Sequence, residues 1–166
     1  GKLIGETARG ARYLHRRLSQ NDWAPFHIVP LPEPDINIVC FAIGHPNLPS
    51  VAHCNEFVGR VYEAMSVRDS SNAHPPDYFV TKTILRSDEY GRSVLPIIES
   101  LGFTEVDYIT AGGLSVIRCT VMDPFLGTQR GKKDHIEGFA QYLRQVLARC
   151  LSDFRQSGQF NSKAKA

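Results

Sequence analysis

Arg118 is the residue whose surroundings most clearly suggest chemistry. It lies in the nearly apolar run 114–122, which is typical of a β-strand, and the two-residue period of a strand places it on one face with Leu114, Val116 and Thr120. An isolated buried guanidinium is costly, so this position requires a partner. The planar fork of arginine fits a carboxylate through two parallel hydrogen bonds. Two interpretations stay open: Arg118 binds the carboxylate of a ligand, or it lies near the open side of the sheet or pairs with a structural Asp or Glu.

Lys82 is a weaker case of the same kind. It lies in the run 78–85, which is rich in β-branched and aromatic residues, and it alternates with Val80 and Ile84. We expect this lysine near a sheet edge, where its stem can lie along apolar surface while its ammonium reaches water.

Two other groups of residues lack the spacing that their chemistry needs. The glycine-rich run 127–133 has three residues between its glycines and a second lysine where a phosphate loop carries Ser or Thr, so it predicts a solvated loop. His45, His53 and Cys54 are the closest candidates for a metal site. Neighbouring residues on a helix point about 100° apart, so His53 and Cys54 cannot both face one ion. We therefore expect no metal site, with Cys54 in the core and His53 at the surface.

The elements that position these residues follow from hydrophobic periodicity. We predict helices at 3–19, 50–67, 94–101 and from 134 onward, and strands at 26–31, 36–43, 78–85, 105–109 and 114–122. Pro30 indicates an edge strand, and the run from Ile38 is apolar on both faces, as in a central strand. The last helix has a capping-box pattern in Asp134 and Glu137, and 105–122 is expected to form a β-hairpin. This order predicts an α+β fold with a mostly antiparallel sheet and helices packed on one side.

Composition limits the possible partners. The chain has 166 residues, enough for one domain, and 19 Lys and Arg against 17 Asp and Glu give a net charge of +2. That charge is too small to indicate a nucleic-acid or membrane partner, and the arginines of the first helix have no interleaved aromatic residues. No apolar run approaches the length needed to span a bilayer. The four cysteines are scattered, three of them within apolar patterns, which favours a reducing, cytoplasmic compartment. The chain opens at Gly1 within a helical pattern, and we expect it to be a piece of a longer protein.

Three segments in order resemble one known family. Residues 34–41, 79–85 and 117–125 are similar to the C-terminal small domain of the group II pyridoxal-phosphate-dependent amino-acid decarboxylases, the glutamate, aromatic-amino-acid and tyrosine decarboxylase type. The resemblance covers about residues 1–155. Its most specific part is Arg118 followed by Met122, Asp123, Pro124 and Phe125.

The resemblance implies a division of the chain and a role for it. Residues 1–20 would be a connector helix, 21–155 the small domain and 156–166 a flexible tail. The small domain would close the active site of a homodimeric enzyme against its own large cofactor-binding domain, with Arg118 binding the substrate carboxylate. The substrate would be a small amino acid with an acidic or aromatic side chain.

The resemblance also implies what the chain lacks. The family binds pyridoxal phosphate through a lysine that follows a histidine, and no His-Lys pair occurs here. The chain would then be inactive alone, with no catalytic residue and no covalently bound cofactor of its own. The stretch 87–113 is longer than the family pattern suggests, which leaves strand register and pocket open. The alternatives are a ferredoxin-like module for small-ligand regulation or oligomerisation, and a structural assembly domain.

Overall fold

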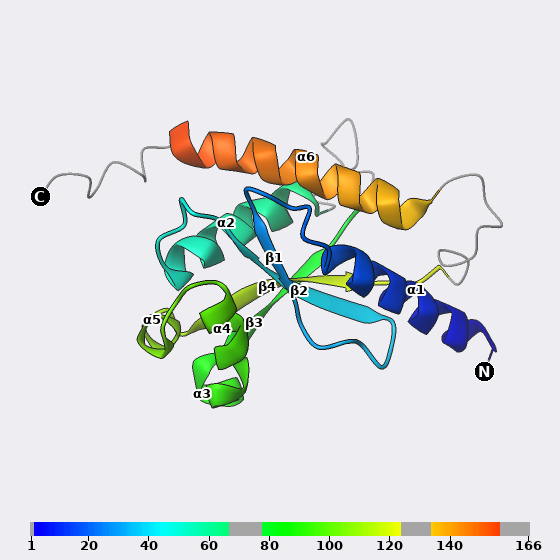
Figure 1. The fold of residues 1–166 in the computed structure, drawn as a ribbon, viewed down its shortest axis with the longest axis horizontal. Coiled ribbons are helices and arrows are strands. Elements are labelled where there is room, and N and C mark those ends of the chain that lie inside the picture. Colours follow the sequence, from blue (N-terminus) through cyan, green and yellow to red (C-terminus); the bar gives the residue numbers. More distant parts are fainter. Residues whose placement is uncertain (1, 67–77, 124–133, 157–166) are drawn as a thin grey trace, which may run out of the picture.

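Three long helices cover one face of a four-stranded sheet, and short helices pack on the opposite face at one end (Figure 1). The computed structural model describes residues 2–66, 78–123 and 134–156. The helices are α1 (Lys2–Leu18), α2 (Val51–Ala64), α3 (Ser87–Tyr90), the 3₁₀ helix η1 (Gly91–Val94), α4 (Leu95–Ser100), α5 (Glu105–Thr110) and α6 (His135–Gln156). The strands are β1 (His27–Pro30), β2 (Ile38–Gly44), β3 (Thr81–Arg86) and β4 (Gly113–Thr120). The predicted α+β fold with an antiparallel sheet is confirmed.

The sheet has the order β1-β2-β4-β3, and every neighbouring pair is antiparallel. β2 and β4 are central because both of their faces are apolar, as the sequence predicts for the run from Ile38. β1 is an edge strand, in agreement with Pro30, which has no N–H to donate to a second neighbour.

The two faces of β4 contact different parts of the core. Ile117 and Cys119 join the main cluster beneath α1, α2 and α6, whereas Leu114 and Val116 join a second cluster with the short helices. Because side chains alternate along a strand, Arg118 lies on the face of Leu114 and Val116. The predicted face of Arg118 is therefore confirmed.

The predicted hairpin over 105–122 is wrong. Residues Glu105–Thr110 form α5, and β4 pairs instead with β3 and β2. A capping box starts this helix: the backbone N–H of Asp107 donates to Thr104 Oγ1 and the backbone N–H of Thr104 donates to Asp107 Oδ2, both at 3.2 Å. These bonds satisfy N–H groups that a short helix otherwise leaves open, so they outweigh the strand tendency of a brief apolar run. The segment 87–113 as a whole holds α3, η1, α4 and α5.

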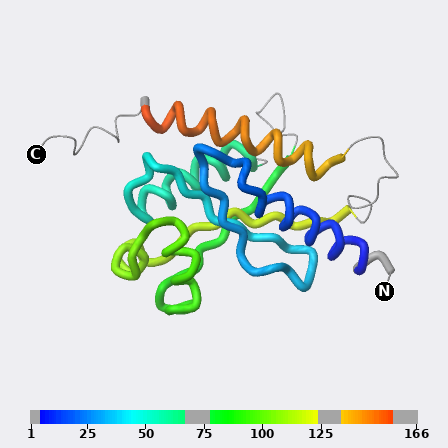
Figure 2. The backbone as a smooth tube through the Cα atoms, viewed as in Figure 1, coloured from blue at the N-terminus to red at the C-terminus, as the bar shows by residue number. Residues whose placement is uncertain are grey.

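α1 and α6 lie side by side although about 120 residues separate them, as the tube in Figure 2 shows. Arg17 is buried, and its Nε donates to Glu137 at 2.7 Å while its Nη1 donates to Asp22 at 3.1 Å. Asp134 caps α6 through the N–H of Glu137, as predicted, but the Glu137 carboxylate binds Arg17 rather than closing the box. Arg17 therefore fixes the first helix to the last.

Candidate functional site

Arg118 is half-buried on the sheet face opposite the three long helices. In the register it is paired with Cys40 of β2 on one side and with Thr81 of β3 on the other. The short helices cover the other end of this face, where Leu114, Val116 and their neighbours are buried. Arg118 thus occupies the less covered part of the sheet.

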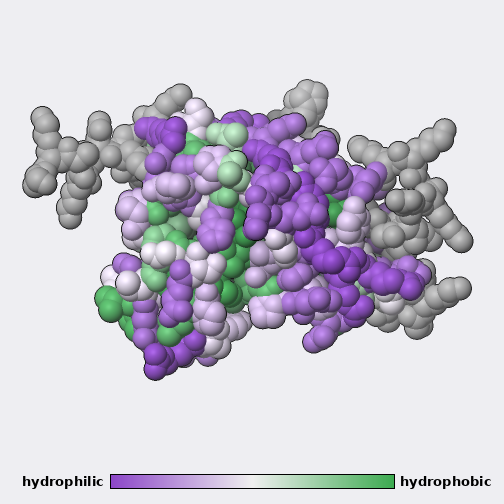
Figure 3. Space-filling model, in the orientation of Figure 1, coloured by the Kyte–Doolittle hydropathy of each residue, from purple (hydrophilic) through white to green (hydrophobic). Residues whose placement is uncertain are grey.

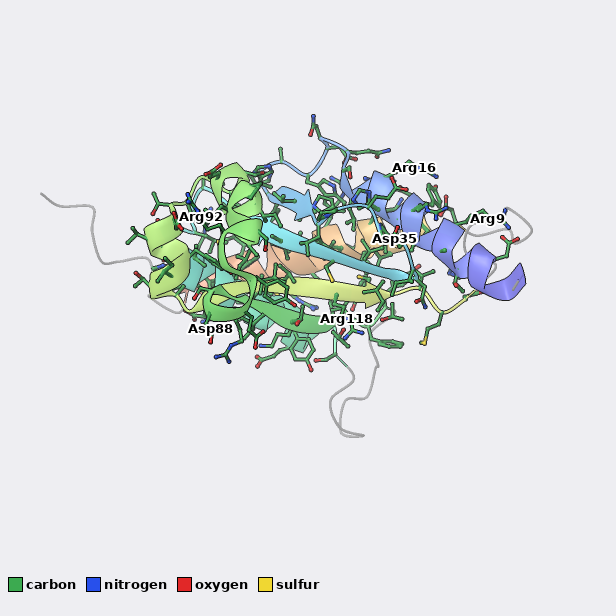
Figure 4. The ribbon with its side chains drawn as sticks, turned by 90° about the horizontal axis from the view of Figure 1, so that it is seen from below. Arg9, Arg16, Asp35, Asp88, Arg92 and Arg118 are labelled. Carbon is green, nitrogen blue, oxygen red and sulfur yellow. The ribbon has the colours of Figure 1, made fainter. Side chains whose placement is uncertain are left out.

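The Arg118 guanidinium makes no hydrogen bond or ion pair with any residue that the structure describes. Figure 4 views this face and shows Arg118 on the sheet, apart from the labelled carboxylates Asp35 and Asp88. The hydroxyl of Thr81 donates to the backbone carbonyl of Arg118 at 3.1 Å, so it is not directed at the guanidinium. Burial raises the pKa of the Cys40 thiol, while the positive charge of Arg118 acts in the opposite direction. The structure therefore presents a half-buried cation flanked by two small uncharged side chains.

A cavity of about 300 Å³ lies at the end of the sheet where β3 begins and β4 ends. Arg118 is one of its lining residues, and several of the others belong to the main cluster on the opposite face of the sheet. Its lining is mainly apolar, and Arg118 is its only arginine or lysine among the described residues. The lining residues come from α1, the segment before β3, the end of β4 and the start of α6: Leu14, Tyr78, Phe79, Val80, Thr81, Arg118, Cys119, Thr120, Val121, Met122, Asp123, His135, Ile136 and Phe139. Such a cavity suits an organic acid with an apolar body.

Exposed apolar side chains surround the cavity. Phe79 and Met122 belong to its lining and are 59% and 64% exposed. Ile36 is 57% exposed and lies close to Met122, because the neighbouring Val121 N–H donates to the Asn37 carbonyl at 2.8 Å. In the view of Figure 3, hydrophilic surface gathers over α1 and apolar surface lies toward the short helices. The described residues leave the apolar rim of the Arg118 cavity uncovered.

The described residues do not fit a covalent pyridoxal phosphate site. Lys82 is the single lysine whose side chain is described, and it pairs with Ile117, on the face opposite Arg118. Its Nζ lies over the ring of Tyr62 at 5.2 Å from the centroid, as a cation on an aromatic face. It is exposed on an edge strand, as the sequence predicts. An aldehyde bound to Lys82 would therefore lie across the sheet from Arg118.

The other candidates from the sequence do not form a site within the described residues. Cys54 is fully buried, which raises the pKa of its thiol to about 12, as expected for a core residue. His53 is half-buried and hydrogen-bonds through Nδ1 to Ser50 Oγ at 2.7 Å, which differs from the surface position predicted for it. No group of three or more metal-binding side chains occurs among the described residues. The run 127–133 lies outside the described residues.

Cys40 and Thr81 are the site residues that the sequence analysis missed. Each is unremarkable in its own strand, and only the pairing of β2 and β3 with β4 brings them to Arg118. The alternation of a strand shows which residues share its face but not which residues of other strands lie opposite. Finding them would have required the register in which β2 and β3 pair with β4.

Comparisons with known proteins agree on one family. A family model described as "Tyrosine decarboxylase, C-terminal" matches residues 11–151. An L-tyrosine decarboxylase of Levilactobacillus brevis is 27% identical over 151 residues, covering 89% of this chain and 23% of the relative. An L-tyrosine decarboxylase of Enterococcus faecalis is 25% identical over 151 residues, covering 89% of this chain and 24% of the relative. The chain thus spans about a quarter of the length of the curated relatives it matches.

Proposed function

This chain belongs to the family of tyrosine decarboxylase C-terminal domains, and from that premise we propose that it is the part of an amino-acid decarboxylase that binds the substrate carboxylate. Arg118 is the residue that performs this role. The observation that carries the proposal is an unpaired, half-buried arginine that is among the residues lining an apolar cavity. A carboxylate there would satisfy the cation in two hydrogen bonds and would fix the orientation of the substrate.

We propose an aromatic rather than an acidic amino acid as substrate. An acidic substrate brings a second carboxylate, which needs a second cation. Among the described lining residues Arg118 is the only arginine or lysine, and most of the others are apolar or aromatic. The relatives named L-tyrosine decarboxylase point the same way.

The partner that we propose for the open sheet face is the cofactor-binding domain of the same protein, in a homodimer. Ile36, Phe79 and Met122 would then be covered by that domain, and the small domain would close over the substrate. Residues 1–20 would connect the two domains, and 21–155 would form the small domain. Burial of exposed apolar side chains around a charged site excludes water and strengthens the pairing of opposite charges.

Pyridoxal phosphate would belong to the remainder of the enzyme. When bound, this cofactor supplies the electron sink for loss of the carboxylate. Among the described residues none is placed to hold it at the Arg118 site, because Lys82 lies on the face away from Arg118. The chain alone is therefore expected to release no CO₂ from tyrosine, even with added pyridoxal phosphate, and release above a blank would contradict this part of the proposal.

We also propose a reducing, cytoplasmic compartment. Cys54, Cys119 and Cys150 are buried free thiols that pack as small apolar side chains. In the part of the chain that the structure describes, no helix has the length and apolar character to cross a bilayer.

The test is steady-state kinetics of the full-length enzyme carrying Arg118→Ala, with Arg92→Ala as the matched control. Arg92 is 82% exposed and pairs with Glu105 at the short-helix end of the domain. Loss of a charge-assisted, bidentate partner is expected to lower kcat/KM for tyrosine by about 100-fold, mainly through KM, whereas the control should stay near the wild type. The thermal midpoint should change little. Unchanged kcat/KM for Arg118→Ala, or a loss that follows a fall in stability, would refute the assignment.

The family match does not favour the regulatory or assembly alternatives. Nothing in the described parts of the chain supports them in preference to a decarboxylase domain.

A further inference from the structure

The row of residues that crosses the sheet at Arg118 has an unusual composition. Cys40, Arg118 and Thr81 are directly paired across β2, β4 and β3. Directly opposite residues in an antiparallel sheet have Cβ atoms about 4.5–5.5 Å apart, within reach of a long side chain. A carboxylate at either flanking position would therefore contact the guanidinium, and such a cross-strand ion pair stabilises a sheet.

Neither neighbour supplies that carboxylate or any other strong acceptor. The Thr81 hydroxyl donates to the Arg118 backbone carbonyl at 3.1 Å, and no hydrogen bond joins its oxygen to the guanidinium. Burial raises the pKa of the Cys40 thiol, so this side chain stays protonated near neutral pH. Both side chains are also short, so they leave room above the sheet for the guanidinium.

We propose that Cys40 and Thr81 are positioning residues for the carboxylate site, because they hold Arg118 between two small uncharged side chains that leave its guanidinium unpaired. This inference rests on the proposed function of Arg118. Its consequence concerns specificity: the charge at positions 40 and 81 decides whether Arg118 is available to a ligand carboxylate or is already neutralised within the protein.

The decisive variants are isosteric pairs that differ only in charge. Thr81→Glu and Thr81→Gln place a carboxylate or an amide opposite Arg118 from β3, and Cys40→Asp and Cys40→Asn do the same from β2. Thr81 is exposed on an edge strand, so its variants are expected to fold even if those at the half-buried Cys40 do not. Ile84→Glu is the control for an added charge, because Ile84 is 50% exposed in the same strand and pairs with Ser115 on the other face.

The assay is inhibition of the full-length enzyme by 3-(4-hydroxyphenyl)propionate, which has a carboxylate, and by tyramine, which has none. Thr81→Glu should weaken inhibition by the acid about tenfold relative to Thr81→Gln, as expected when a charge-assisted pair must be displaced. Inhibition by tyramine should be the same in both variants, and Ile84→Glu should match the wild type. Adding Thr81→Glu to Arg118→Ala should have no further effect, because the cation that it neutralises is gone.

Two failures can be told apart. If Arg118→Ala does not weaken inhibition by the acid, the proposed function of Arg118 is wrong. If Arg118→Ala weakens it but the acid and amide variants at position 81 behave alike, Arg118 binds the ligand and the positioning role of its neighbours is wrong. The inference would also be overturned if Thr81→Glu weakened inhibition by the acid and by tyramine equally. Such a result would show that the size of the new side chain, rather than its charge, weakens binding.

Discussion

Asn55 of α2 completes the backbone hydrogen bonding of β4, and its removal should destabilise the whole domain. Its Nδ2 donates to the Gly113 carbonyl at 2.8 Å, and its Oδ1 accepts from the Ser115 N–H at 2.7 Å. The pairing of β2 with β4 extends only as far as Phe41 and Ile117, so Gly113 and Ser115 have no β2 partner. The side-chain amide takes the place of the missing strand.

The expected cost of Asn55→Ala follows from these two bonds. Gly113 and Ser115 are buried, and each backbone group left without a partner costs about 1–3 kcal/mol. Alanine recovers about 0.5 kcal/mol through its higher helix propensity. The free energy of unfolding should therefore fall by about 2–5 kcal/mol. If the free energy of unfolding falls by about 2 kcal/mol per molar urea, the urea midpoint should fall by about 1–2.5 M.

The measurements are urea unfolding and amide hydrogen exchange at Ser115, which should become faster. Asn55→Asp is an informative second variant, because it keeps an acceptor for the Ser115 N–H but faces the Gly113 carbonyl with a second oxygen. The control is Glu56→Ala on the same helix, whose pair with Arg60 is partly exposed and is worth about 0.5 kcal/mol or less. A loss below about 1 kcal/mol for Asn55→Ala, with unchanged exchange at Ser115, would refute the reasoning.

Three further variants test other parts of the fold. Arg17→Met should lower the free energy of unfolding by only about 1–3 kcal/mol, because Glu137 and Asp22 are partly exposed and can be solvated. An NMR titration should show the pKa of Glu137 rising, since Arg17 holds it below its usual range. Gly113→Ala should cost at least about 2 kcal/mol in urea unfolding, because φ is +143° and the new Cβ would lie 2.6 Å from the Leu85 carbonyl oxygen. Burial and nearby Arg155 lower the pKa of His45 in the folded protein. Because the unfolded chain then binds the proton more readily, the contribution of His45 to the free energy of unfolding is complete above pH about 6.5 and is lost as the pH falls toward the folded pKa. His45→Gln should reduce the decrease in the free energy of unfolding between pH 7.5 and 5.5. If the free energy of unfolding depends on pH as steeply in the variant as in the wild type, His45 is not the source of that decrease.

Several features of the fold could be predicted because they depend on local patterns. The apolar run from Ile38 indicated a central strand, Pro30 indicated an edge, and the stripe after Asp134 indicated the last helix, all of which the structure confirms. The strand at 105–109 was predicted wrongly because a brief apolar run favours a strand and a helix almost equally. The Thr104–Asp107 capping box that decides between them was present in the sequence and was overlooked.

The sequence by itself determined that Arg118 lies in an apolar strand and on which face, because side-chain alternation is a property of one strand. It also carried the family resemblance, which the comparisons bear out. Only the tertiary structure decided what lies beside Arg118. The register of β2 and β3 against β4 depends on core packing between residues far apart in the chain, and it is this register that places Cys40 and Thr81, rather than a carboxylate, against the guanidinium.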